Sequence, residues 1–299
     1  MSIFTGSAVA LVTPFNNEGI NFKKLEELID FQIKGKTDGI VLAGTTGEAP
    51  TIEENELFEL FERGIKYINK RVPAICGVGA NNTAAVVRRA KKAYEFGADG
   101  LLIVNPYYNK SNDEGLIAHY QAISDATPLP IIIYNVPSRT GKNITPALLN
   151  KLADIENVKA VKEASGDISQ ICDVLDMCGD RLDVYSGNDD QILAITALGG
   201  KGVISTTANM EPELNHDIYE EFEKGNIAKA RELQFRLNEL HHPVFAAANP
   251  IPLKTAMNMV GFEVGPLRLP LIELSGKARE NLAAALVEFG YTLTEKAKA

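Results

Sequence analysis

A short apolar segment followed by a turn and an amphipathic segment occurs eight times in this chain of 299 residues. Each apolar segment is rich in Val, Ile or Leu, and each amphipathic segment carries Lys and Glu on one face, as a helix does. The apolar segments are residues 8–13, 39–43, 74–77, 100–104, 131–134, 158–162, 183–186 and 203–205. Helical segments between them include residues 22–33, 53–67, 83–96 and 168–177.

Nearly continuous apolar strands that alternate with helices predict a parallel sheet covered by helices, which is an α/β fold. Eight units in series predict closure into a (β/α)8, or TIM, barrel, and the chain has the length of such a domain. An open, doubly wound sheet is the structural alternative, because hydrophobic periodicity alone does not separate the two.

After the eighth unit the strands stop and helical segments follow one another. These segments are residues 213–223, 227–240, 252–259 and 275–289. We therefore assign residues 1–224 to a catalytic barrel and residues 225–299 to a C-terminal helical region. We expect this region to pack against the barrel, and it need not take part in catalysis.

Charge and composition limit the partners of the protein. The net charge is −9, and a nucleic-acid surface needs a basic stripe, so no nucleic-acid partner is expected. No apolar run approaches the roughly 18 residues of a membrane span, and no secretory signal pattern is recognised. We expect a cytosolic protein without a membrane partner, in which the three cysteines are reduced thiols.

Neither a metal nor an organic cofactor is expected. The four histidines form no H-x-x-x-H or H-x-H pattern at a strand end, as a catalytic zinc site would need. Glycine-rich residues 77–82 match a dinucleotide fingerprint only in part, and residues 199–202 precede the eighth strand, at the wrong end of a barrel for a phosphate site. Enzymes that form carbon–carbon bonds stabilise a carbanion with a metal or with a lysine imine, so the lysines become the candidates.

Lys162 stands at the end of the sixth apolar segment, at the end of the barrel where active sites form. A solvated surface lysine is the ordinary alternative, because lysine is among the most exposed residue types. If the side chain points into the barrel, burial lowers its pKa and yields the free amine that attacks a ketone. Lys159, earlier on the same strand, is expected to point to the other face or towards the opposite end.

Other polar side chains follow neighbouring strands. The glycines and threonines of residues 44–48 suit the binding of a small carboxylate, or form a plain strand-to-helix turn. Tyr108 and Tyr134 are candidates for proton transfer, linked through Thr45, or simply packing residues. Arg139 either binds a second carboxylate with its planar fork or forms a surface ion pair.

These motifs resemble the 4-hydroxy-tetrahydrodipicolinate synthase family, also named the dihydrodipicolinate synthase family, within the pyruvate-dependent class I aldolase superfamily. The G-T-T-G-E loop at residues 44–48 and a lysine after the sixth strand are shared across the superfamily. P-Y-Y-N at residues 106–109 and Y-N-V-P-S-R-T-G at residues 134–141 are characteristic of the synthases. The resemblance extends over the whole chain, from residues 6–10 to residues 249–254.

The resemblance implies a lyase that condenses pyruvate with L-aspartate 4-semialdehyde to give 4-hydroxy-tetrahydrodipicolinate, the first committed step of lysine and diaminopimelate biosynthesis. It implies no cofactor, because the imine forms on the protein itself. The implied site consists of Lys162 for the imine, Tyr134, Thr45 and Tyr108 for a proton relay, Thr46 and Ile204 for pyruvate, Gly187 for substrate binding and Arg139 for the carboxylate of the aldehyde.

In this family Tyr108 reaches into the site of a neighbouring subunit, so the resemblance also implies a homo-oligomer, either a dimer or a dimer of dimers. A sister pyruvate aldolase, of the N-acetylneuraminate lyase or sugar-acid aldolase type, is the alternative, and Arg139 favours the synthase. A non-catalytic barrel used for binding is the third possibility. The complete set of Lys162, Tyr134, Thr45 and Tyr108 disfavours it.

The chain departs from lysine-inhibited members of the family at the pocket where they bind lysine. Asn81 and Tyr107 match that pocket. The serine, two histidines and glutamate of the enteric enzymes are replaced here by Ala49, Glu54, Leu57 and Ala85. The resemblance therefore implies that feedback inhibition by lysine is weak or absent.

Overall fold

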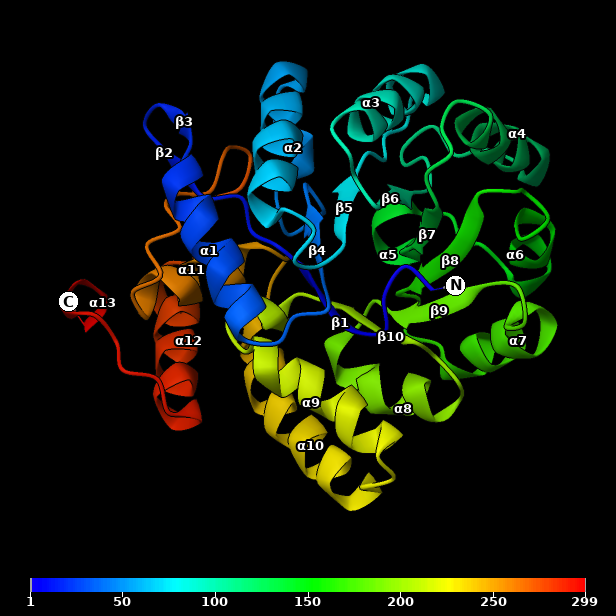
Figure 1. The fold of residues 1–299 in the computed structure, drawn as a ribbon. Helices are drawn as coiled ribbons and strands as arrows, with labels where there is room; N and C mark the ends of the chain where they lie inside the picture. Colours follow the sequence, from blue (N-terminus) through cyan, green and yellow to red (C-terminus); the bar gives the residue numbers. More distant parts are fainter. Residues whose placement is uncertain (1, 299) are drawn as a thin grey trace.

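Eight parallel strands form a closed barrel in the computed structural model, which describes residues 2–298 (Figure 1). The strands are β1 (Gly6–Ala10), β4 (Gly39–Leu42), β5 (Ala74–Gly77), β6 (Gly100–Val104), β7 (Ile131–Asn135), β8 (Val158–Glu163), β9 (Asp183–Ser186) and β10 (Gly202–Ser205). Strand β1 pairs with both β4 and β10, which closes the ring. The predicted (β/α)8 barrel is confirmed, and the open sheet is excluded.

Helices surround this ring and continue beyond it. The helices between the barrel strands, together with the one after β10, are α1 (Phe22–Lys34), α2 (Glu54–Ile68), α3 (Thr83–Glu95), α4 (Asp113–Ser124), α5 (Pro137–Thr140), α6 (Pro146–Leu152), α7 (Ile168–Cys178), α8 (Ile192–Ala197) and α9 (Pro212–Glu223). The C-terminal helices are α10 (Ile227–Val244), α11 (Ile251–Met259), α12 (Gly276–Phe289) and α13 (Glu295–Lys298). Within residues 2–298, no helix combines the length and the apolar character that a membrane span needs.

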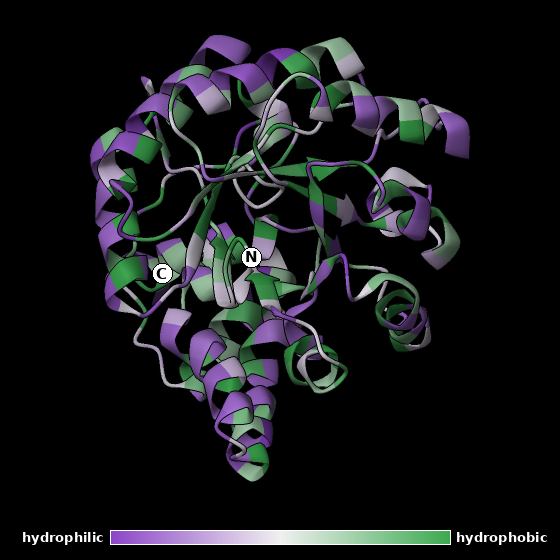
Figure 2. Ribbon diagram, turned by 45° about the vertical axis from the view of Figure 1, so that its right-hand side comes forward, coloured by the Kyte–Doolittle hydropathy of each residue, from purple (hydrophilic) through white to green (hydrophobic). Residues whose placement is uncertain are grey.

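Two layers of apolar side chains form the core, because each strand has one face towards the barrel axis and the other towards the helices. Figure 2 shows the hydrophobic strands at the centre and the mixed surfaces of the helices around them. Inside the barrel, Phe4 stacks on Tyr185 at 4.2 Å between ring centroids, and the Tyr185 hydroxyl donates to the Phe4 carbonyl. These two rings fill the end of the barrel at which the strands begin, so the opposite end is left for a site.

Two boundaries differ from the predictions by three residues or more, and three short turns were not predicted. Strand β1 ends at Ala10, whereas the apolar segment continues to residue 13, because the chain then turns into a hairpin of β2 (Phe15–Asn16) and β3 (Gly19–Ile20). Helix α10 continues past the predicted residue 240 and contains Pro243 near its end. Short 3-10 turns, which have no hydrophobic period, follow β4, β9 and β10 as η1 (Ala49–Thr51), η2 (Asp189–Gln191) and η3 (Thr207–Asn209).

The C-terminal helical region packs on one side of the barrel, next to α9 and α1 (Figure 1). A turn at Gly225, with φ of +81°, separates α9 from α10. Helix α10 then packs against α9 and α12, while α11 packs against α12. The segment between α10 and α11 reaches the open end of the barrel, and this brings the region into the site described next.

Candidate active site

Lys162 points into the barrel from strand β8. Its side chain is only 5% exposed, and its ammonium nitrogen lies 4.4 Å from the centre of the Tyr134 ring. Burial lowers the pKa of Lys162 to about 8, while Asp189 acts in the opposite direction and Arg139 adds to the lowering. At pH 7 roughly a tenth of this amine is therefore uncharged, far more than for an ordinary lysine, and the uncharged form is the nucleophile. Lys159 is exposed at an irregularity in the pairing of β7 with β8.

Tyr134 is the residue of β7 that pairs directly with Lys162 of β8. Its ring is buried, and this burial raises the pKa of the phenol. Arg139 and the hydroxyl of Thr45 lower the pKa of Tyr134 again in part. A protonated phenol therefore lies beside a partly deprotonated amine, which is an arrangement suited to proton transfer.

A cavity of about 180 Å³ opens above Lys162 and Tyr134. Its walls come from the segments that follow several different strands, as expected at this end of a barrel. The lining residues include Thr45, Thr46, Tyr134, Arg139, Lys162, Gly187, Asn188, Thr206, Phe245 and Asn249. The volume suits a small molecule of few heavy atoms.

Hydroxyl and amide groups order one wall of this cavity. The Asn249 side-chain amide donates to the Thr46 hydroxyl at 2.9 Å, and the Thr206 hydroxyl lies 3.4 Å from the same oxygen. Arg139 donates to the carbonyl oxygen of Asn249 at 2.9 Å. Asn249 thus connects two of the expected substrate-binding residues, although it was not itself among the expected site residues.

The remaining expected site residues lie in three different settings. Gly187 lines the cavity, and an added Cβ there would approach the Ala164 side chain at 2.6 Å, so only glycine fits. Ile204 is fully buried inside the barrel and is not among the residues that line the cavity. Tyr108 is 92% exposed with φ of +72°, so within one chain it does not join Lys162.

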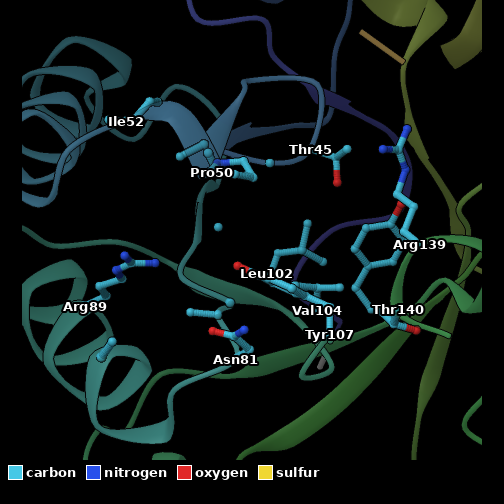
Figure 3. A pocket seen from close by; sticks show the side chains of 18 of the residues that line it. Thr45, Pro50, Ile52, Asn81, Arg89, Leu102, Val104, Tyr107, Arg139 and Thr140 are labelled. Carbon is cyan, nitrogen blue, oxygen red and sulfur yellow. The ribbon is translucent and has the colours of Figure 1, made fainter. Parts of the chain in front are cut away.

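A second, larger cavity of about 420 Å³ shares a wall with the first. Gly44, Thr45, Leu102, Tyr134 and Arg139 line both. Figure 3 shows Thr45 and Arg139 at one end and Asn81 and Arg89 at the other. A molecule in the larger cavity would therefore contact the same Thr45 and Tyr134 side chains that face Lys162.

Asp189, a residue that the sequence patterns did not single out, lies close to this lysine. Its carboxylate is buried and accepts hydrogen bonds from the backbone N–H groups of Thr206 and Thr207, at 3.1 Å and 2.6 Å. It raises the pKa of Lys162 against the effect of burial. This negative charge is suited to balance the positive charge of an iminium group at Lys162.

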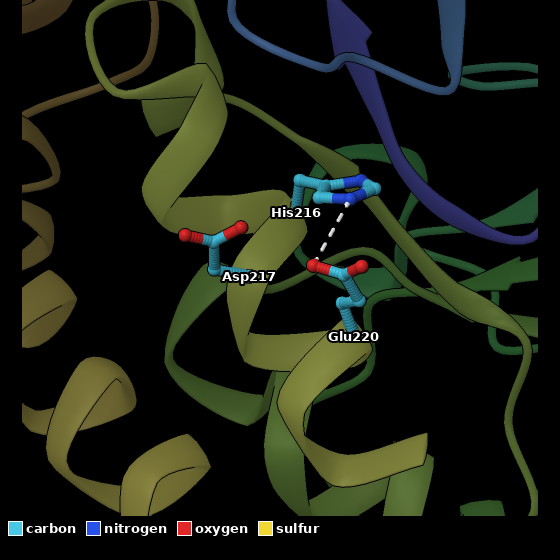
Figure 4. A group of neighbouring side chains, drawn as sticks. All are labelled: His216, Asp217 and Glu220. Atoms are coloured by element: carbon cyan, nitrogen blue, oxygen red, sulfur yellow. Dashed lines mark ion pairs between the residues drawn. The ribbon is translucent and has the colours of Figure 1, made fainter. Parts of the chain in front are cut away.

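One other cluster deserves comparison as a possible metal site. His216, Asp217 and Glu220 of α9 have ligand atoms within 4.8 Å of one another (Figure 4). These groups already have partners, since His216 Nδ1 contacts Asp38 at 2.8 Å and the two carboxylates pair with Lys36 and Lys224. None of the three lines the cavity above Lys162. The cluster is a network of ion pairs on the outside of the barrel.

The barrel and the buried amine at the carboxyl ends of its strands define a (β/α)8-barrel enzyme. Residues 3–289 match the dihydrodipicolinate synthetase family, and the chain belongs to this family. Relatives named 4-hydroxy-tetrahydrodipicolinate synthase include one from Clostridium perfringens, 50% identical over 286 residues that cover 94% of this chain and 98% of the relative. Another, from Caldicellulosiruptor bescii, is 50% identical and covers 99% of this chain and 100% of the relative.

Solved structures agree with this assignment. The dihydrodipicolinate synthase of Aquifex aeolicus superposes with a TM-score of 0.95 at 38% identity, covering 98% of this chain and 100% of that one. A structure of the enzyme from Cyanidioschyzon merolae with lysine bound gives a TM-score of 0.93 at 35% identity, covering 97% and 99% of the two chains. The expected family, fold and lyase class are confirmed, and the synthase is favoured over the sister aldolases.

Proposed function

We propose that this enzyme condenses pyruvate with L-aspartate 4-semialdehyde through an imine on Lys162 and forms 4-hydroxy-tetrahydrodipicolinate. The observation that carries the proposal is the buried amine of Lys162 beside Tyr134, in a small cavity walled by Thr45, Thr46 and Arg139. The names of the relatives from Clostridium perfringens and Caldicellulosiruptor bescii support the choice of product.

The neutral amine of Lys162 attacks the ketone carbon of pyruvate, and loss of one water gives the imine. Removal of a proton from the methyl group forms an enamine, whose carbon attacks the aldehyde of the second substrate. The amino group of that substrate then displaces Lys162, which closes the ring and returns the free lysine. The imine serves as the electron sink, so we propose that no metal or organic cofactor takes part.

We assign the proton transfers to Tyr134 and Thr45, because the phenol lies beside the lysine and Thr45 influences its pKa. Thr46 is suited to bind the carboxylate of pyruvate, with Gly187 leaving space for the substrate. We assign Ile204 a packing role, because it belongs to the same buried apolar cluster inside the barrel as Tyr134. Arg139 lines both cavities, so its guanidinium is suited to the carboxylate of the aldehyde.

We further propose that the enzyme is at least a dimer, in which Tyr108 of the partner subunit completes the relay. Two observations support this. Tyr108 has φ of +72°, which non-glycine residues seldom adopt, and its side chain is 92% exposed, so it is available to contact a second copy of the chain. One solved relative is described as a monomeric variant, which points to an oligomer as the usual state. A cytosolic location stays a prediction.

Weak or absent inhibition by lysine is also proposed. Ala49 and Ala85 line the larger cavity with methyl groups, which offer no hydrogen bond to an ammonium or a carboxylate. Glu54 is within ion-pair distance of both Arg88 and Arg89. Leu57 is buried in the hydrophobic core instead of facing the cavity. The polar groups that would bind a free amino acid are therefore reduced in number.

Borohydride reduction in the presence of pyruvate, followed by peptide mass mapping, tests the proposed imine. We expect a pyruvate-derived adduct on Lys162, and loss of both adduct and activity in Lys162→Ala. The matched control is Lys159→Ala, at the one exposed position of the same strand, which should keep both. An adduct on another residue, or none in the parent enzyme, would contradict the mechanism.

A further inference from the structure

The loop that carries Thr45 and Thr46 begins and ends in backbone conformations that are unfavourable for its residues. Ala43 has φ of +53° and Glu48 has φ of +56°, and neither is glycine. Residues with a side chain stay in this left-handed region only where surrounding contacts impose it. Such contacts are present at Glu48, whose side chain is completely buried.

Glu48 forms an ion pair with Lys254 of α11, in the C-terminal helical region. The distance from Lys254 Nζ to Glu48 Oε1 is 2.7 Å, and both side chains are 0% exposed. The ammonium also donates to the carbonyl oxygens of Pro266 at 2.9 Å and Thr13 at 3.1 Å. An ammonium has three donors, so all of them are used.

The second oxygen of the Glu48 carboxylate is bound as well. It accepts the backbone N–H of Arg268 at 2.9 Å. Thr13, which accepts from Lys254 through its carbonyl, donates through its hydroxyl to the carbonyl oxygen of Gly47 at 2.7 Å. The pair thus connects the end of the loop, the segment after β1 and the segment after α11.

Helix α11 holds the loop at a second point. Asn249, immediately before the first turn of the helix, donates to the Thr46 hydroxyl at 2.9 Å. The N–H of Lys254 donates to the carbonyl oxygen of Pro250, so Lys254 lies in the first turn of the helix that follows Asn249. One helix therefore contacts the loop both at Thr46 and at Glu48.

We propose that Glu48 and Lys254 are positioning residues of the reaction, which fix the hydroxyls of Thr45 and Thr46 relative to Lys162 without touching the substrate. The inference rests on the proposed function, since it concerns the groups that bind pyruvate and transfer its protons. Buried ion pairs contribute little net stability compared with apolar side chains of similar shape, whereas they select one conformation in some proteins. The pair is therefore expected to matter for activity more than for folding.

The test is the double variant Glu48→Gln/Lys254→Met, which removes both charges and leaves no unpaired ion. We expect it to fold with a somewhat lower urea midpoint, because the carbonyl oxygens of Thr13 and Pro266 lose the donor that Lys254 supplied, and to form the borohydride-trapped imine at saturating pyruvate. Its KM for pyruvate should rise and its kcat should fall, each on the order of tenfold to a hundredfold, because small displacements of positioned groups have effects of this size. The KM for the aldehyde should change by less than about threefold, because we assign the binding of its carboxylate to Arg139.

Glu56→Gln is the matched control. Glu56 pairs with Arg268 at 2.6 Å next to the Glu48–Lys254 pair, but it is not part of the loop. We expect its KM for pyruvate to remain within about twofold of the parent value. If the substitutions only made this region less ordered, the double variant and Glu56→Gln would show similar effects. In that case the fraction of enzyme with a trapped imine would fall, while the KM values for pyruvate and for the aldehyde would stay unchanged.

A folded double variant with parental KM and kcat would overturn the inference, and so would a loss of kcat with an unchanged KM for pyruvate. If the double variant does not fold, Glu48→Asp decides instead, since it keeps the charge but shortens the reach to Lys254; an unchanged KM for pyruvate there refutes positioning. Absence of any adduct in the parent enzyme would instead refute the proposed function, so the two failures are distinguishable.

Discussion

Lys162 has its ammonium group in a place where a charge is unfavourable, and this has a consequence for folding. Burial lowers the pKa of Lys162 from its ordinary value of 10.5 to about 8. Each pKa unit corresponds to about 1.4 kcal/mol, so the buried charge destabilises the folded state by about 3 kcal/mol at neutral pH. Lys162→Met removes this charge and keeps a long, adaptable apolar side chain. We expect the variant to be inactive and more stable.

The sign and the pH range follow from proton binding. Below pH 8 Lys162 is charged in both states, and the full penalty is present. Between about pH 8 and 10.5 the folded state has released the proton while the unfolded state still holds it, so stability rises with pH. The advantage of Lys162→Met should therefore be about 3 kcal/mol at pH 7 and about 1 kcal/mol at pH 10.

Urea unfolding of both proteins at equal protein concentration, without pyruvate, measures this difference. Comparing the two at each pH cancels the titration of all other groups. Lys159→Met, at the one exposed position of β8, is the control and should leave the free energy of unfolding unchanged within about 0.5 kcal/mol. The reasoning is refuted if Lys162→Met is no more stable than the parent at pH 7, or if its advantage does not shrink towards pH 10.

Four further predictions concern activity. The rate of pyruvate-dependent inactivation by borohydride should rise with pH through about 8, as Lys162 loses its proton, and a rate that is flat from pH 6 to 9 would contradict this. Tyr134→Phe should lower kcat on the order of a hundredfold while the trapped imine still forms, because one proton-transfer group is lost; a parental kcat would remove Tyr134 from the relay. Asn249→Ala should raise the KM for pyruvate severalfold by freeing the Thr46 hydroxyl, while the aldehyde KM, measured alongside, changes less. L-lysine at millimolar concentration should leave steady-state turnover nearly unchanged, and strong inhibition at sub-millimolar concentration would disprove that expectation.

The fold was predictable because every strand of the barrel is buried on both faces. Seven of the eight segments coincide with a strand to within about two residues at each end. The strands of a parallel sheet that is covered by helices are nearly continuous apolar runs, so each run marks a strand. The first segment failed at its end: Leu11 and Val12 are as buried as a strand but lie beyond the ladder, where the chain turns into the β2–β3 hairpin. Hydrophobicity indicates which residues are buried, and at β1 the buried residues continue past the last residue that pairs with a neighbouring strand.

The position of Lys162 was predictable for a related reason. A polar residue at the carboxyl end of an apolar barrel strand lies at the end of the barrel where active sites form. The pairing of Lys162 with Tyr134 was not predictable, because the register of β7 with β8 shifts between Ile131 and Ile132. Asp189 and Asn249 could not be found in this way. Asp189 belongs to a short 3-10 turn, and Asn249 precedes a helix, so neither sits in a pattern with a period that points to the site.

The contacts of the C-terminal helical region with the site are the feature that local sequence patterns could not predict. Its helices were expected to pack on the barrel without a need for a role in catalysis, yet Asn249 and Lys254 contact Thr46 and Glu48, about 200 residues earlier in the chain. Such contacts depend on how β1 and β10 close the ring and where α10 then directs the chain. The buried carboxylate of Glu48 in the G-T-T-G-E motif is satisfied by groups far along the chain, namely the ammonium of Lys254 and the backbone N–H of Arg268. The motif and helix α11 therefore act as one unit, and a change in either should alter the KM for pyruvate before other properties.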